Sequence, residues 1–260
     1  MIEVRAAAKS FVFEGRQTPA LQAVDLNIAE GSFVALVGPS GCGKSTLLNM
    51  MAGLIRPSQG YIAHGGRRIE SVNTGVGYMT QQDNLLPWRS ALDNVMLPLI
   101  IRGAREADAR ASAMSMLDRV GIERFARHFP SQLSGGMRKR ASLAQLLVQN
   151  PSTILMDEPF GALDAQLKVS MQKLLLSLWE GSGKTLVFVT HDLAEAITLA
   201  DQIVVFSGRP GRIRSIESSS LPRPRDAIGG QFSPAFQALY QRLWGLLAPD
   251  IESAVNGVSS

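Results

Sequence analysis

Long hydrophobic runs are missing from this chain of 260 residues, which holds one cysteine, Cys42, and three histidines. A single cysteine excludes an intrachain disulfide. Because His64, His128 and His191 show no metal-ligand spacing with it, we expect no structural zinc. No stretch approaches the roughly 20 apolar residues of a membrane span, and residues 1–9 lack the apolar core of a signal peptide. These absences favour a cytoplasmic protein.

Aromatic residues are few, at 6% of the chain, and neither sign of charge dominates. A hydrophobic share of 45% with 18% charged residues is typical of a soluble globular protein of one or two domains, and it excludes a disordered chain or a fibre. A net charge of +4 is compatible with anionic lipid headgroups, but scattered lysines and arginines more often form a solvated surface. We expect no nucleic-acid partner.

A glycine-rich run is the most informative segment of the sequence. An apolar run, 33–37, leads into it, and a helix predicted over 46–52 and capped by Gly53 follows it. Glycines let successive backbone N–H groups turn toward phosphates, while Lys44 would reach the β- and γ-phosphates and Ser45 would bind Mg²⁺. The strand and helix on either side are the context that distinguishes a phosphate-binding loop from an ordinary turn. The run consists of Gly38, Pro39, Ser40, Gly41, Cys42, Gly43, Lys44, Ser45 and Thr46. The thiol of Cys42 is expected to face the nucleotide, so that alkylation inhibits and ATP protects.

Two further apolar runs, 154–156 and 186–189, predict buried strands of a parallel sheet that end in polar residues. Because ligands of open α/β sheets bind at the carboxyl ends of the strands, these residues meet the glycine-rich loop at one rim. Asp157 would hold Mg²⁺ through water, and Glu158 would orient and polarise the water that attacks the γ-phosphorus. His191 would donate a hydrogen bond to the γ-phosphate. For Asp157 and Glu158 the alternative is a carboxylate pair at a helix N-terminus, and for His191 it is a histidine with a purely structural role.

A second glycine motif, Leu133 to Met137, lies far along the chain. Ser134, Gly135 and Gly136 open a helix predicted over 137–148, and they offer a hydroxyl, backbone N–H groups and a positive dipole end to an anion. Alone, this segment would be a loop with an N-cap. The first loop already completes one phosphate site in each chain. The anion-binding character of the second motif therefore favours contact with a nucleotide held by a second subunit.

The chain divides into two parts by composition. Residues 1–215 are predicted to form an ATPase domain, with a helical subdomain inserted at about 83–150 that includes a helix over 107–120. Residues 216–260 form a linker, rich in Ser, Pro and Arg over 218–225, and a C-terminal helix. Phe236, Leu239, Tyr240, Leu243 and Leu247 lie at helical spacing, which favours packing on the protein's own domain over a regulatory or dimer contact.

With these motifs in place, the sequence resembles the nucleotide-binding subunits of ABC transporters over nearly its whole length. Walker A corresponds to 38–45, Walker B to 154–158, the D-loop to Gly161 through Asp164, and the switch histidine to His191. The resemblance implies a P-loop NTPase with a mainly parallel core sheet, an antiparallel β part and an inserted helical subdomain.

The same resemblance implies the ligands and the assembly. ATP and Mg²⁺ would bind in a head-to-tail dimer with a second copy or a paralogue, and Asp164 and the 134–136 segment would contribute to its nucleotide sites. Gln81 matches the Q-loop glutamine, which contacts both the nucleotide and the metal. Phe11 matches the aromatic residue that stacks on adenine, although Phe13 is close enough to compete and core packing is the alternative for either.

Finer features resemble the nitrate, sulfonate and taurine uptake ATPases: the segments 85–88 and 207–213, and Met137 in place of the usual glutamine. A departure is Gln145, where the family carries arginine.

The resemblance implies a peripheral subunit on the cytoplasmic face of the inner membrane, bound to permease subunits and indirectly to an extracytoplasmic solute-binding protein. We expect the 85–95 segment to line the cleft that receives a helix of the permease; the alternative is internal packing of the helical subdomain. The main alternative is a soluble ABC ATPase of an assembly pathway such as iron-sulfur cluster assembly. A small-molecule kinase has no use for the second glycine motif.

Overall fold

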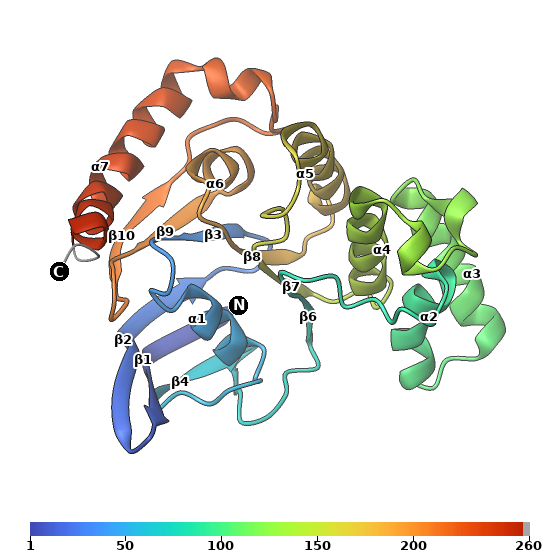
Figure 1. The fold of residues 1–260 in the computed structure, drawn as a ribbon, viewed down its shortest axis with the longest axis horizontal. Coiled ribbons are helices and arrows are strands. Elements are labelled where there is room, and N and C mark those ends of the chain that lie inside the picture. Colours follow the sequence, from blue (N-terminus) through green and yellow to red (C-terminus); the bar gives the residue numbers. More distant parts are fainter. Residues whose placement is uncertain (257–260) are drawn as a thin grey trace.

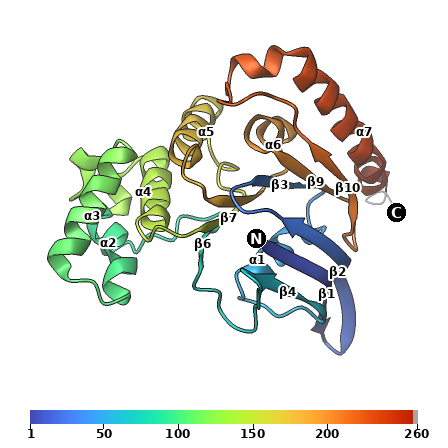
Figure 2. The ribbon, with the colours of Figure 1, turned by 180° about the vertical axis from the view of Figure 1, so that it is seen from behind.

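The computed structural model describes residues 1–256, with side chains up to Asp250. Residues 257–260 of the predicted extension lie outside this part. Two sheets form the body of the protein (Figure 1, Figure 2). The smaller sheet is antiparallel with the strand order β2-β1-β4-β5. Its strands are β1 (Ile2–Phe13), β2 (Arg16–Ile28), β4 (Gln59–His64) and β5 (Arg67–Arg68).

The larger sheet has six strands in the order β10-β9-β3-β8-β7-β6. All neighbours except the edge pair of β9 and β10 are parallel. The fold therefore matches the expected mainly parallel core sheet with an antiparallel part. Its strands are β3 (Phe33–Val37), β6 (Val76–Met79), β7 (Thr153–Asp157), β8 (Thr185–Val189), β9 (Gln202–Phe206) and β10 (Ile213–Ser218).

Every residue of β3 and β8 is buried, as their continuous apolar sequences predict. Alternate side chains of β3 point to opposite faces of the sheet. Phe33 and Ala35 join a core with α5 (Ala165–Trp179) and α6 (Leu193–Leu199), while Val34 joins a second core with α1 (Lys44–Met51) and the antiparallel sheet. The carboxyl ends of β3, β7 and β8 thus meet between two cores that hold them rigidly.

A helical part extends from the β6 edge of the large sheet (Figure 1). It contains α2 (Ala91–Ile101), α3 (Glu106–Arg119) and α4 (Gly135–Leu147), with short 3-10 turns at Glu123–Phe125 and Pro130–Gln132. Both helices predicted in this region are present with bounds shifted by one or two residues. Within the described residues, no helix is both long and apolar enough to cross a bilayer.

The linker predicted from residue 216 begins inside a strand, contrary to expectation. Ile213–Ser218 forms β10, which pairs antiparallel with β9, from Ile213 opposite Phe206 to Ser218 opposite Gln202. A 3-10 turn (Gly229–Phe232) precedes α7 (Pro234–Asn256). Phe236, Leu243 and Leu247 of α7 are buried in the main core, which agrees with packing on the protein's own domain.

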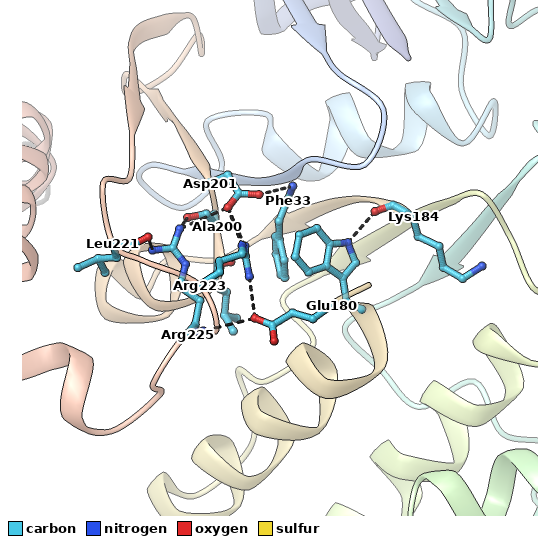
Figure 3. A network of polar contacts seen from close by, with 10 residues as sticks. Phe33, Glu180, Lys184, Ala200, Asp201, Leu221, Arg223 and Arg225 are labelled. Atoms are coloured by element: carbon cyan, nitrogen blue, oxygen red, sulfur yellow. Dashed lines mark hydrogen bonds and ion pairs between the residues drawn. The ribbon is translucent and has the colours of Figure 1, made fainter. Parts of the chain in front are cut away.

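Arg223 fastens the linker to the body of the protein (Figure 3). Its guanidinium donates to Asp201 Oδ1 at 2.8 Å and to Glu180 Oε1 at 3.2 Å, and lies 4.3 Å from the ring centre of Trp179. Arg225 also pairs with Asp201. The path from β10 to α7 is therefore held by a charged network at the C-terminal end of α5.

Candidate nucleotide site

The loop between β3 and α1 has a backbone that requires glycine. Gly41 and Gly43 have φ values of +74° and +97°, a region that favours glycine over other residues. At Gly43 an added Cβ would lie 2.8 Å from the carbonyl oxygen of Ala20, and at Gly38 it would lie 2.9 Å from Phe206. Both the conformation and the tight packing explain why glycine recurs in this loop.

Lys44 lies within the curve of this loop. Its Nζ donates to the carbonyl oxygens of Gly38 and Pro39, both at 2.8 Å, and its side chain is buried. Helix α1 begins here with Gly43 as its N-cap, and its first turn holds no acidic residue and no side-chain cap. A buried ammonium and the positive end of a helix therefore act together on one anion.

A cavity of about 410 Å³ opens over the loop. Phe11 and Phe13 lie at its edge with exposed fractions of 45% and 73%, so core packing does not account for either aromatic ring. The cavity is lined by Phe11, Phe13, Thr18, Ala20, Ser40, Gly41, Gly43, Lys44, Ser45, Thr46, Glu158 and Arg209. A cationic floor with aromatic residues at the rim suits a ligand that combines phosphates with a flat ring.

Gly38, Pro39 and Cys42 do not line the cavity, although they belong to the predicted loop. The thiol of Cys42 is fully buried in the core beneath the loop, 3.6 Å from Lys44 Nζ. The expectation that this thiol faces the nucleotide is wrong, because the loop curls its side chain inward. Burial raises the pKa of the Cys42 thiol, and the nearby ammonium opposes only part of that rise.

Ser45 and Asp157 bring two oxygen ligands together. Ser45 Oγ donates to Asp157 Oδ1 at 2.9 Å, and burial raises the pKa of the Asp157 carboxyl. No group of three His, Cys, Asp or Glu side chains among the described residues could hold a metal. A hydroxyl and one carboxylate nevertheless suit Mg²⁺, which keeps several waters and takes phosphate oxygens as ligands.

Glu158 connects three loops of the site. It follows β7 with a φ of +44°, an uncommon value for a residue other than glycine, and such strain is typical of functional sites. Its Oε2 lies 3.3 Å from His191 Nδ1 and 3.5 Å from Gln81 Nε2, and its backbone N–H donates to Val189. The residues predicted at the ends of separate strands thus converge on one carboxylate.

The second glycine motif does not line this cavity. Ser134 is the N-cap of α4 and accepts a hydrogen bond from Met137 N at 3.3 Å. Gly136 is packed tightly, since an added Cβ would lie 2.5 Å from a methyl group of Leu167. Asp164 caps α5 by accepting from Leu167 N at 2.9 Å. The motif therefore packs on the first turn of α5, directly after the D-loop, and lies outside the cavity over the phosphate loop of the same chain.

Sequence reasoning missed Arg209, Thr18 and Ala20 as cavity residues. Thr18 and Ala20 come from β2, and no local motif marks them. Arg209 belongs to the 207–213 segment, which we used above only for its resemblance to one group of importers. An arginine in a glycine- and proline-containing turn directly after a buried strand was the available signal.

Comparisons with known proteins agree with this geometry. The sequence profile described as "ABC transporter" matches residues 21–161. The taurine import ATP-binding protein TauB of Rhizobium johnstonii is 41% identical over 98% of this chain and 100% of its own length. TauB of Yersinia pestis is 45% identical over 78% of this chain and 79% of its own.

A dimeric structure of MJ0796, a bacterial ABC transporter cassette, superposes with a TM-score of 0.76 at 36% identity, covering 84% of this chain and 98% of the other. A post-hydrolysis dimer of the same cassette, with ADP and Pi bound, gives a TM-score of 0.75 with the same coverage.

Proposed function

Because the chain belongs to the ABC transporter family and is an ABC ATPase, we propose that it powers the uptake of a small solute resembling taurine, sulfonate or nitrate. The convergence of Ser45, Asp157, Glu158 and His191 around the phosphate loop carries this proposal. The ATPase domain, predicted over 1–215, would extend to the end of β10 at Ser218, and the residues after it would form an extension. The names of the taurine import relatives support the class of solute.

ATP enters the cavity with its phosphates on the loop. Lys44 and the N–H groups at the start of α1 stabilise the phosphate charge, and Phe11 or Phe13 stacks on adenine. Ser45 and Asp157 would hold Mg²⁺, with Gln81 as a further ligand, and the ion would supply positive charge against the phosphates.

Hydrolysis depends on Glu158 and His191 in this proposal. Glu158 accepts a hydrogen bond from the attacking water and polarises it, so that the oxygen attacks the γ-phosphorus as the bond to ADP breaks. His191, whose Nδ1 lies 3.3 Å from Glu158 Oε2, donates its N–H to the γ-phosphate. The products are ADP and phosphate.

A head-to-tail dimer would complete the site. Ser134, Gly135 and Gly136 offer backbone N–H groups and a helix N-terminus, yet none of them lines the cavity of its own chain. An added Cβ at Gly135 would meet only the far end of Arg138, so this part of the motif leaves room for an anion. ATP between two subunits would close the dimer, and hydrolysis would open it.

The permease would dock on the loop before α2. Asn94 is fully buried, and its side chain bonds to the backbone of Leu86, Arg89 and Ser90. This clamp holds the loop rigid while Trp88 remains 70% exposed. An exposed tryptophan on a fixed loop, seven residues after Gln81, suits a helix of a membrane partner. The subunit would thus lie on the cytoplasmic face of the inner membrane, with the solute-binding protein a partner through the permease.

The test is to solubilise native membranes in mild detergent, capture this chain and identify its companions. A multi-span membrane protein supports the transporter proposal, whereas soluble assembly factors alone would overturn it in favour of an assembly ATPase. Trp88→Ala should lose the membrane companion while keeping ATPase activity. Phe232→Ala is the matched control, since Phe232 is 77% exposed and ends the 3-10 turn that precedes α7, a helix that lies apart from α2 (Figure 1).

A further inference from the structure

The segment 207–213, between β9 and β10, packs directly against the phosphate loop. Gly211 donates to the carbonyl oxygen of Ala20 at 3.2 Å and accepts from Gln22 N at 2.8 Å. An added Cβ at Gly211 would lie only 1.7 Å from the carbonyl oxygen of Cys42. The backbones of the two loops are therefore in contact, and this segment is part of the wall of the nucleotide site.

Arg209 projects from this segment to the cavity. Its Nε donates to the carbonyl oxygen of Gly41 at 2.8 Å, and its side chain is exposed and lines the cavity. An added Cβ at Gly41 would lie 3.5 Å from Arg209 Cζ, so the guanidinium plane lies on the loop itself. In the part of the chain that the structure describes, Arg209 makes no ion pair.

The single hydrogen bond of Nε leaves most of the donors of Arg209 available. A guanidinium carries five N–H donors in a fixed fork and matches the geometry of phosphate oxygens. The bond to Gly41 fixes the side chain, so less conformational entropy is lost when a second partner binds. A second cation beside Lys44 also balances the charge of a polyphosphate better than Lys44 alone.

We propose that Arg209 is a nucleotide-binding residue whose terminal guanidinium nitrogens donate to a phosphate oxygen of the bound nucleotide. This inference rests on the proposed function of the site as an ATP site. Arg209 comes from a segment distant in the sequence. Its Nε donates to the backbone oxygen of Gly41, and its terminal nitrogens would donate to a phosphate of the ligand. The contact would favour ATP and ADP over ligands without phosphates.

The experiment measures the binding of ATP and ADP with Mg²⁺, and of adenosine, by competition with a fluorescent ATP analogue. Arg209→Ala and Arg209→Gln should weaken ATP and ADP binding about tenfold or more, because a charge-assisted hydrogen bond is lost. Gln can still donate to Gly41 but carries no charge, so it separates phosphate contact from support of the loop. Arg209→Lys should keep part of the affinity. Adenosine binding should not change.

Arg212→Ala is the matched control. Arg212 is an exposed arginine of the same segment that lines a neighbouring cavity of about 520 Å³ and not the nucleotide cavity. The ATP affinity of the Arg212→Ala variant should equal that of the unmodified protein. Wild-type affinity should also fall more steeply with added salt than that of Arg209→Ala, since one ionic contact is missing in the variant.

Two results would overturn the inference. Wild-type ATP affinity in Arg209→Gln would mean that the side chain only supports Gly41. An equal loss for adenosine and ATP would mean that Arg209 acts on the nucleoside rather than on a phosphate. Either result leaves the proposed function intact as long as the unmodified protein binds ATP and Lys44→Ala does not. Failure of the unmodified protein to bind ATP would reject the proposed function itself.

Discussion

Lys168 Nζ lies 3.0 Å from Glu195 Oε1, and this ion pair joins the first turn of α5 to α6. Lys168 also contacts Asp192 Oδ2 at 3.1 Å, while Glu195 Oε2 accepts a hydrogen bond from Thr190 Oγ1 at 2.7 Å. The Glu195 side chain is only 4% exposed. Because α5 follows the D-loop and Thr190 precedes His191, one buried carboxylate links two loops of the proposed catalytic site.

Replacing Lys168 by Met should destabilise the protein by about 2 kcal/mol, since the buried Glu195 carboxylate loses its partner. Urea unfolding measures this, and Lys168→Met with Glu195→Gln should recover part of the loss. Lys173→Met, at an exposed position of the same helix, is the control. If Lys168→Met unfolds at the same urea concentration as the control, the ion pair does not stabilise the fold.

The cost of Lys168→Met should also depend on pH. Burial raises the pKa of Glu195, and removing the ammonium raises it further. In the variant the folded state then keeps a proton that the unfolded state releases, so stability falls as pH rises from the unfolded pKa, near 4.5, through the folded pKa. We expect a larger difference from wild type at pH 8 than at pH 5. An equal difference at both values would contradict the buried ionised pair.

Glu158→Gln should reduce ATP turnover at least 100-fold, because water activation is lost while the phosphate contacts remain. The variant should still bind ATP and accumulate as an ATP-bound dimer. Phosphate release and size-exclusion chromatography measure the two effects. Glu106→Gln, at an exposed position of α3, is the control. Normal hydrolysis by Glu158→Gln would remove this carboxylate from the proposed role.

The local part of this site could be predicted from sequence, and the long-range part could not. A buried strand followed by a glycine-rich loop and a helix is encoded within about twenty consecutive residues, so the geometry around Lys44 follows from local rules. Arg209 meets Gly41 across 168 residues, and Lys168 meets Glu195 across 27. Such contacts depend on the strand order, which apolar runs alone do not specify. β10 was missed because its only apolar residues, Ile213 and Ile216, are three positions apart and lack the alternation typical of a half-buried strand.

Cys42 should react slowly with iodoacetamide in the folded protein. The thiol is fully buried and burial raises its pKa, so at pH 8 it has neither access to the reagent nor a substantial thiolate fraction. Mass spectrometry should show labelling at least tenfold slower than in protein unfolded by urea, with or without ATP. Fast labelling of the folded protein, suppressed by ATP, would mean that the thiol faces the nucleotide after all.

Gly211 and Gly245 should respond in opposite ways to substitution by alanine. At Gly211 the new Cβ would lie 1.7 Å from the backbone oxygen of Cys42, so the phosphate loop or the 207–213 segment has to move. We expect a loss of about 3 kcal/mol in the free energy of unfolding, together with weaker ATP binding.

Gly245 lies within α7, and an added Cβ there would meet nothing within 4 Å. Gly245→Ala should stabilise the protein by about 0.5–1 kcal/mol, because alanine loses less backbone entropy in a helix, and ATP affinity should stay unchanged. Urea unfolding and nucleotide titration on both variants measure this, and equal ATP affinity in the two would contradict the contact between the segment and the loop.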